Sequence, residues 1–255
     1  MNDYSPSNPP PLPITAATAG GDVLEAEPSA AELAPIGSLG AMLEALLRRP
    51  RGVLHHLSGA EAARLIGLLL FIAAVGAALY GVVVGTFSGG TQLWAAPVKI
   101  TAGLFFCGAI CLPSLYVFAC LTGSVARIND VIGMVAGLLA LMTLLLFSFA
   151  PIAWVFSQST ESVAAMGSMH LLFWLVATYF GARFLYHGMA RLGARSKGSF
   201  YVWMTIFVLV ALQMTTALRP LVGKADTFLP KEKMFFLQHW GEAFSTDKST
   251  TPKTD

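Results

Sequence analysis

The chain has 255 residues, of which 55% are hydrophobic and 12% are charged, and its formal net charge is +2. A charged fraction about half that of a soluble domain leaves too few charges to solvate a globular surface. The mild net charge is also unlike that of a nucleic-acid-binding protein. These figures exclude an ordinary soluble enzyme and predict a membrane protein with no nucleic-acid partner.

Residues 1–35 are rich in proline and acidic residues and contain no lysine or arginine. A secretory signal needs a basic start and an apolar core, and both are missing here. The segment has too little apolar surface to offset the cost of ordering the chain. We therefore expect a disordered acidic tail, either solvated or bound to a partner.

Residues 36–63 have a different pattern. Apolar residues recur at helical spacing between Leu39 and Leu47, and Arg48, Arg49 and Arg51 follow. The segment predicts a cytoplasmic amphipathic helix lying on anionic lipid, ended or kinked at Pro50. The alternative is a solvated helix whose arginines only set the topology of the membrane domain.

Five unbroken apolar segments are long enough to cross the hydrocarbon core, which needs roughly 20 helical residues. They lie at about residues 65–86, 98–121, 131–156, 169–190 and 201–218, within a transmembrane domain at 64–219. Lys99 lies at the edge of the second segment. The sequence predicts an all-α polytopic membrane protein, a five-helix bundle with interfacial amphipathic helices at both ends.

Positive charge is concentrated in alternate connections between the spans. This pattern predicts a cytoplasmic amino terminus and an outer carboxyl terminus, in a membrane such as the bacterial inner membrane. The basic residues after the last span oppose this orientation. The residues that support it are Arg48, Arg49, Arg51, Arg64, Arg127, Arg191, Arg195 and Lys197.

Small residues recur every four positions in the first four spans, and those of the first and third spans are the predicted helix-packing residues. Such spacing lets helix backbones approach closely, either within one chain or in an oligomer. We favour packing within the chain. The residues are Ala73, Ala77, Gly81, Gly85, Gly133 and Gly137.

Two charged residues are candidates for an intramembrane pair. Arg183 lies inside the fourth span, about two turns from its end, and Asp130 opens the third span. If both lie at one membrane level, an ion pair would lower the cost of both charges. The alternative is that Arg183 extends alone to the headgroups.

The sequence contains no phosphate-binding loop, zinc-protease motif or nucleophile elbow. Cys107 and Cys111 are one helical turn apart, but neither a histidine nor an acid stands beside them, so we expect them to be packing residues. We therefore expect no enzymatic activity, no cofactor and no metal.

Residues 220–255 follow the last span and are predicted to form an outer tail. An amphipathic helix is predicted at about 230–244, binding lipid or docking a partner protein. Its apolar face is formed by Met234, Phe235, Leu237 and Trp240.

Five closely spaced spans after a cytoplasmic arm resemble the Yip1 domain superfamily. The strings LLRRPRGVLHHL at 46–57 and TALRPLVG at 216–223 also resemble uncharacterised bacterial multi-pass proteins. The similarity covers roughly residues 40 to 223. It implies a membrane-embedded organiser without catalytic residues, and it does not carry a GTPase partner to this chain.

The expected function is a non-catalytic scaffold or accessory subunit that contacts the lipid bilayer and other membrane proteins. The alternative is a small transporter or channel component. Pro113 and Pro151 support this alternative because transporters use broken helices at their substrate sites.

Overall fold

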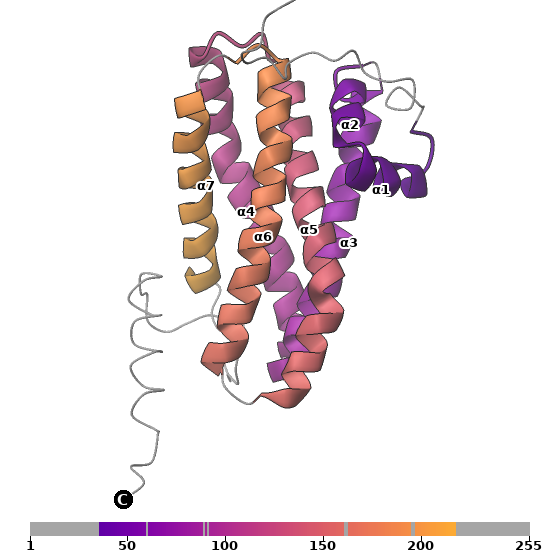
Figure 1. The fold of residues 1–255 in the computed structure, drawn as a ribbon, viewed down its shortest axis with the longest axis vertical. Helices are drawn as coiled ribbons and strands as arrows, with labels where there is room; N and C mark the ends of the chain where they lie inside the picture. Colours follow the sequence, from indigo (N-terminus) through magenta and orange to yellow (C-terminus); the bar gives the residue numbers. More distant parts are fainter. Residues whose placement is uncertain are drawn as a thin grey trace, which may run out of the picture.

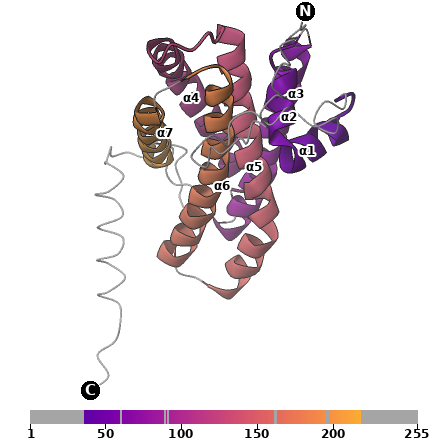
Figure 2. The same ribbon diagram turned by 45° about the horizontal axis from the view of Figure 1, so that its top comes forward.

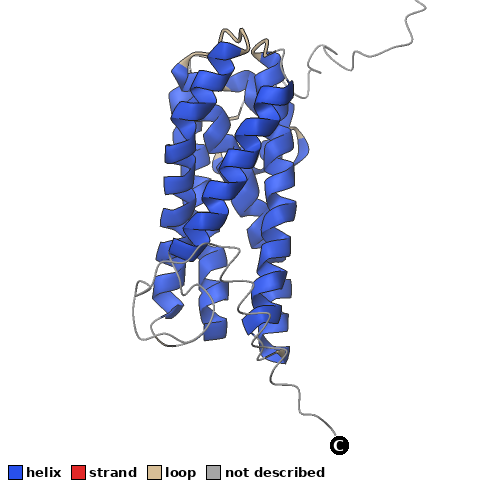
Figure 3. Ribbon diagram, turned by 90° about the vertical axis from the view of Figure 1, so that its left-hand side faces the viewer, coloured by secondary structure: helices blue, strands red, loops and turns tan. Residues whose placement is uncertain are grey.

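The computed structural model describes residues 36–59, 61–88, 90, 92–160, 163–194 and 197–217. Within these ranges the chain forms seven helices and no strand (Figure 3). Two short helices come first, α1 (Leu39–Arg48) and α2 (Pro50–His56). The long helices are α3 (Ala62–Ser88), α4 (Gln92–Leu121), α5 (Ile128–Ser159), α6 (Val163–Arg191) and α7 (Lys197–Ala217).

Each of the long helices is long and apolar enough to cross a membrane. The candidate spans range from 19 residues in α7 to 32 in α5, against the roughly 20 that a hydrocarbon core needs. The predicted all-α bundle with five spans is therefore confirmed. The helices extend beyond their apolar centres: α4 begins at Gln92, not near Val98, and contains Pro97 within its first two turns.

Consecutive spans run in opposite directions, so α3, α5 and α7 are parallel (Figure 1). α5 lies at the centre and packs against α3, α4 and α6, whereas α7 lies at the edge against α4 (Figure 2). A central helix must be apolar on all sides, and every residue of α5 from Gly133 to Thr143 is buried. We call the end of the bundle that carries α1 and α2 the arm end, and the opposite end the far end.

Glycines are located where helices approach most closely. Gly133 lies against Leu57 and Ile66, and Gly137 lies against the ring of Phe184. In α3, Gly81 lies against the backbone of α4. All six of the small residues predicted to pack are buried within this chain: Ala73, Ala77, Gly81, Gly85, Gly133 and Gly137.

The arm before the first span consists of two helices. Ser38 caps α1 by accepting a hydrogen bond from the Ala41 amide (3.2 Å), and Pro50 opens α2. Proline is favoured at a first helical position because its missing N–H would be unsatisfied there. The break predicted at this proline therefore separates two helices.

The apolar side of the arm packs against protein, although we predicted lipid as its main contact. Its buried residues belong to one hydrophobic cluster with the spans: Met42, Ala45, Leu46, Val53, Leu54 and Leu57. Leu39 and Leu47 remain exposed. An amphipathic pattern identifies an apolar face, but it does not distinguish a lipid surface from a neighbouring helix bundle as its cover.

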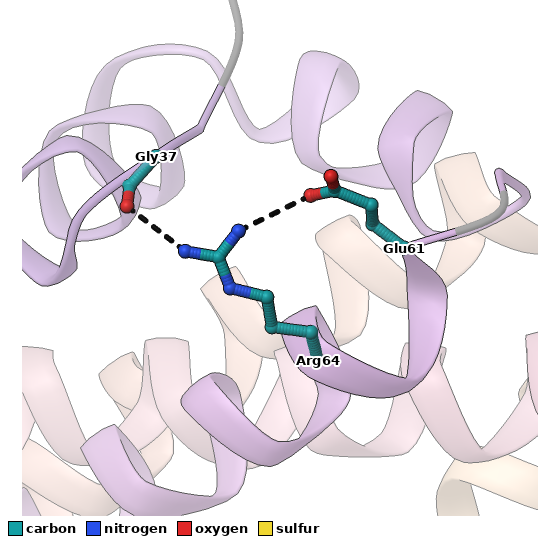
Figure 4. A network of polar contacts seen from close by, with 3 residues as sticks. All are labelled: Gly37, Glu61 and Arg64. Atoms are coloured by element: carbon teal, nitrogen blue, oxygen red, sulfur yellow. Dashed lines mark hydrogen bonds and ion pairs between the residues drawn. The ribbon is translucent and has the colours of Figure 1, made fainter.

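A polar contact joins the arm to the start of the first span (Figure 4). The guanidinium of Arg64 donates to the carbonyl of Gly37 (3.1 Å) and pairs with Glu61 (3.4 Å). Both charged side chains are exposed, so this pair is worth only about 0.2–1 kcal/mol. The apolar contacts of the arm therefore hold it more strongly than this bridge does.

The two predicted tails lie outside the described residues. This applies to the acidic segment 1–35 and to the outer segment that carries Met234, Phe235, Leu237 and Trp240.

A methyl group added at Gly81 would overlap the backbone of Pro97, so α3 and α4 would have to separate. We expect Gly81→Ala to destabilise the bundle by about 1–3 kcal/mol, the usual cost of overpacking. Unfolding of the purified protein in mixed detergent micelles measures the change.

Gly67→Ala is the matched control. It lies in the same helix, where an added methyl group meets nothing within 4 Å, and alanine has the higher helix propensity. This variant should be neutral or slightly stabilised. An equal loss in both variants would contradict the packing argument.

Candidate functional site

Arg183 is an exposed charged residue on α6, inside a membrane span. It lies eight residues before Arg191, the last residue of the helix, which corresponds to about 12 Å along the axis. The buried side of α6 packs against α5, with Gly137 against Phe184 and Phe149 stacked on Phe173. In this antiparallel register Arg183 is level with the middle part of α5.

Other residues mark where the membrane surfaces lie. At the arm end, Arg64, Arg127, Arg191 and Lys197 all lie close to helix termini. At the far end, the exposed Trp94 and Trp154 lie near the termini of α4 and α5, as expected of side chains that prefer the interface. Arg183 therefore lies about two turns, or 12 Å, below the level of these terminal cations.

The direction in which the Arg183 side chain leaves the helix disfavours contact between its guanidinium and the nearer membrane surface, at the arm end. Cα–Cβ bonds in a helix tilt toward its amino terminus. The amino terminus of α6 is at the far end, whereas the nearer surface for Arg183 is at the arm end. The guanidinium must therefore bend back against this tilt to reach headgroups.

The surroundings of Arg183 on this face are partly polar. Tyr179, one turn toward the far end, is 62% exposed. His187, one turn toward the arm end, places its Nδ1 2.6 Å from the carbonyl oxygen of Arg183. Because a carbonyl only accepts, Nδ1 carries the hydrogen in this contact. The imidazole is thus bound to its own helix, and the guanidinium of Arg183 is the permanent charge on this face.

The predicted pair of Arg183 with Asp130 is not formed. An Asp130 carboxylate oxygen accepts a hydrogen bond from the Arg127 amide (2.9 Å) in a capping box at the start of α5. In the α5–α6 register Asp130 is level with the end of α6, about 13 Å from the depth of Arg183. Ion pairs do form between other residues, such as Arg48 with Glu44 (3.7 Å) and Arg64 with Glu61 (3.4 Å).

Lys99 is a second charged residue within a span, and it is only 1% exposed. The sequence predicts Lys99 at the edge of a span, because the apolar run begins near it. The helix begins at Gln92, however, so Lys99 lies two turns inside α4. Because Gly81 contacts Pro97, Lys99 is level with the half of α3 that is nearer to the far end.

Two buried hydroxyl groups also stand out. Hydroxyls in these spans usually donate to a carbonyl of their own helix, as Thr143 does to Ala140 (3.0 Å) and Thr205 to Tyr201 (2.9 Å). The Oγ1 atoms of Thr101 in α4 and Thr178 in α6 are buried and have no hydrogen-bond partner among the described residues. A buried polar atom left in this state costs about 1–3 kcal/mol.

The register of the helices gives these threonines a common depth. Gly76 of α3 lies against Thr143 of α5, and Gly81 of α3 lies against Pro97 of α4. With the α5–α6 contacts, these pairs place Thr101, Thr143 and Thr178 at nearly the same level. A layer of hydroxyl groups therefore crosses the bundle near its middle.

A buried tyrosine and a histidine pair nearer to the far end. The hydroxyl of Tyr80 in α3 lies 2.6 Å from Nδ1 of His170 in α6, and the two rings meet edge to face. Nε2 of His170 is buried without a partner among the described residues. The two residues are 90 positions apart, so helix periodicity gave no signal for this pair.

Polar contacts also connect α7 to the bundle. The indole N–H of the buried Trp203 donates to the Cys111 carbonyl (3.0 Å) and to the Ser114 hydroxyl (3.1 Å). The thiol of Cys107 points at the Phe207 carbonyl (3.8 Å). The thiols of Cys107 and Cys111 are both buried, and neither forms a disulfide. The described residues contain no group of three or more histidine, cysteine or acidic side chains that would hold a metal.

Comparisons of the chain with protein-family models, with curated proteins and with solved structures found no match. The resemblance to the Yip1 domain superfamily therefore stays a hypothesis that rests on topology and short strings.

Removing the Tyr80 hydroxyl would leave both ring nitrogens of His170 buried without a partner. We expect Tyr80→Phe to lower the free energy of unfolding by about 1–3 kcal/mol. Thermal unfolding in detergent would detect this loss. Tyr179→Phe is the control because that hydroxyl is on an exposed side chain, and it should change little. If the two variants behave alike, the Tyr80–His170 bond does not stabilise the bundle.

Proposed function

We propose that the protein is a non-catalytic accessory subunit or scaffold that binds another membrane protein through the exposed face of α6. The observation that carries this proposal is Arg183, exposed on a span and about two turns below the terminal cations of the arm end. A charge within a span costs up to about 2.5–3.5 kcal/mol on insertion scales, the value at the helix centre, and such residues normally face protein or water. A neighbouring protein would remove most of this cost.

The face around Arg183 fits a protein contact. Tyr179 and Phe180 are both exposed, and their rings meet edge to face. Tyrosine and arginine are among the residues most often found to dominate binding energy at interfaces. The small residues that could have formed an oligomer interface are instead buried within the chain. The face of α6 is therefore the surface that we assign to a partner.

A second candidate function is a small transporter or channel component. It is favoured by the buried layer of Thr101, Thr143 and Thr178, with Lys99 buried in the same half of the bundle. Polar groups inside a span often mark a solute path. Solute flux into liposomes that contain only this protein would favour this candidate over an accessory subunit.

Photocrosslinking in native membranes tests the proposed function. We expect a photoreactive phenylalanine analogue at Tyr179 to give a discrete protein adduct. The same analogue at Val75, exposed on α3 at a similar depth, should give lipid adducts. If both positions react only with lipid, the face of α6 does not bind a protein.

We also propose that the arm end faces the cytoplasm, as in a protein of the bacterial inner membrane. Every described lysine or arginine except Lys99 and Arg183 lies at the arm end, and positive charge favours the cytoplasmic side. Reporter fusions after Lys197 and after Lys233 should therefore lie on opposite sides of the membrane. The same side for both fusions would contradict this orientation.

A further inference from the structure

We infer that the partner which covers α6 contributes a transmembrane helix with one aspartate or glutamate at the depth of Arg183. This inference rests on the proposed accessory function and adds the chemistry of the partner. The permanent cation on the exposed face of α6 is the guanidinium of Arg183, because arginine stays protonated in proteins. A single carboxylate would neutralise that cation.

A carboxylate suits Arg183 better than other acceptors do. The planar guanidinium offers two parallel N–H groups to the two oxygens of a carboxylate, and such charge-assisted bonds are roughly twice as strong as neutral ones. The carboxylate would otherwise be as costly in hydrocarbon as the arginine. Pairing thus removes two penalties, while a serine or asparagine on the partner would remove only one.

The depth of Arg183 argues against a phospholipid headgroup as the natural acceptor. Arg191 marks the level of the headgroups at the arm end, about 12 Å from Arg183 along α6. The helical tilt also starts the side chain in the opposite direction. A phosphate would have to enter the hydrocarbon, whereas a carboxylate on a helix is already there.

A second copy of this chain does not offer the required group within the described residues. Their carboxylates are those of Glu44, Glu61 and Asp130. The first two belong to the arm and its connection to α3, and Asp130 caps α5 at the arm end. Among the described residues no carboxylate could serve this role, and the inference assigns it to a different chain.

The probe for this inference is a leucine–alanine transmembrane helix with one glutamate about 12 Å from one end. A soluble domain at one end fixes its orientation in phosphatidylcholine liposomes that contain the full-length protein. Energy transfer between dyes on the probe and on the protein measures binding. The same helix with glutamine, and one with the glutamate at the mirror-image depth, are the controls.

We expect the glutamate helix to bind at least tenfold more tightly than either control helix. Arg183→Leu should abolish this preference, and Arg183→Lys should keep part of it because lysine retains the charge but not the paired N–H geometry. Arg183→Leu replaces an exposed charge with an apolar side chain, so it should still fold, which thermal unfolding checks. Arg48→Leu, an exposed arginine of the arm, should leave the preference unchanged.

Equal binding of the glutamate and glutamine helices would overturn the inference, as would a preference that survives in Arg183→Leu. Loss of the preference on adding phosphatidylglycerol would also overturn it, because it would identify a headgroup as the better acceptor. A protein adduct at Tyr179 with no glutamate preference would leave the accessory function standing and reject only the carboxylate. A glutamate preference without any protein adduct would reject the accessory function and the natural partner with it, and would show only that Arg183 can bind a carboxylate.

Discussion

Close contact between helices at small residues is the constraint on which this bundle depends. Lipid tails are as apolar as leucine, so burying apolar side chains gives little drive for helices to associate in a membrane. The free energy of helix association must then come from van der Waals contact. Such contact requires that the helix backbones approach closely. Gly76 and Gly81 allow this for α3, and Gly133 and Gly137 for α5. Polar contacts such as that of Tyr80 with His170 then join the side chains of helices that are already close.

The same constraint determines where Arg183 points. Gly181 lies against Leu138 and Met142 of α5, so this side of α6 faces the centre of the bundle. Successive helical residues are separated by about 100°, which places Arg183 about 200° around the helix from Gly181. Its exposure therefore follows from the packing of a neighbour two positions away. A bundle that buries Gly181 must present Arg183 to whatever surrounds the protein.

The five spans were predictable because a long apolar run indicates a membrane span by itself, independently of the neighbouring segments. The contacts between spans were not predictable in this way. Asp130 was predicted at the level of Arg183 from its place near a helix start, but the register fixed by Phe149 and Phe173 sets the two depths apart. Lys99 was misplaced because hydropathy marks the apolar part of a helix and not its first residue. Whether two side chains on different helices form a pair depends on the register of those helices. A single sequence, without knowledge of the contacts between helices, does not give that register.

Lys99 and Arg183 show how two similar charges meet the membrane differently. Lys99 is enclosed by its own chain, where protein dipoles can be fixed in place around it, so its cost is met during folding. Arg183 is exposed, and hydrocarbon offers no dipoles to replace water. Folding alone leaves that cost unchanged, because no described carboxylate is at its depth. The free energy that remains is available to binding, and it favours any helix that brings a negative charge to that level over helices that do not.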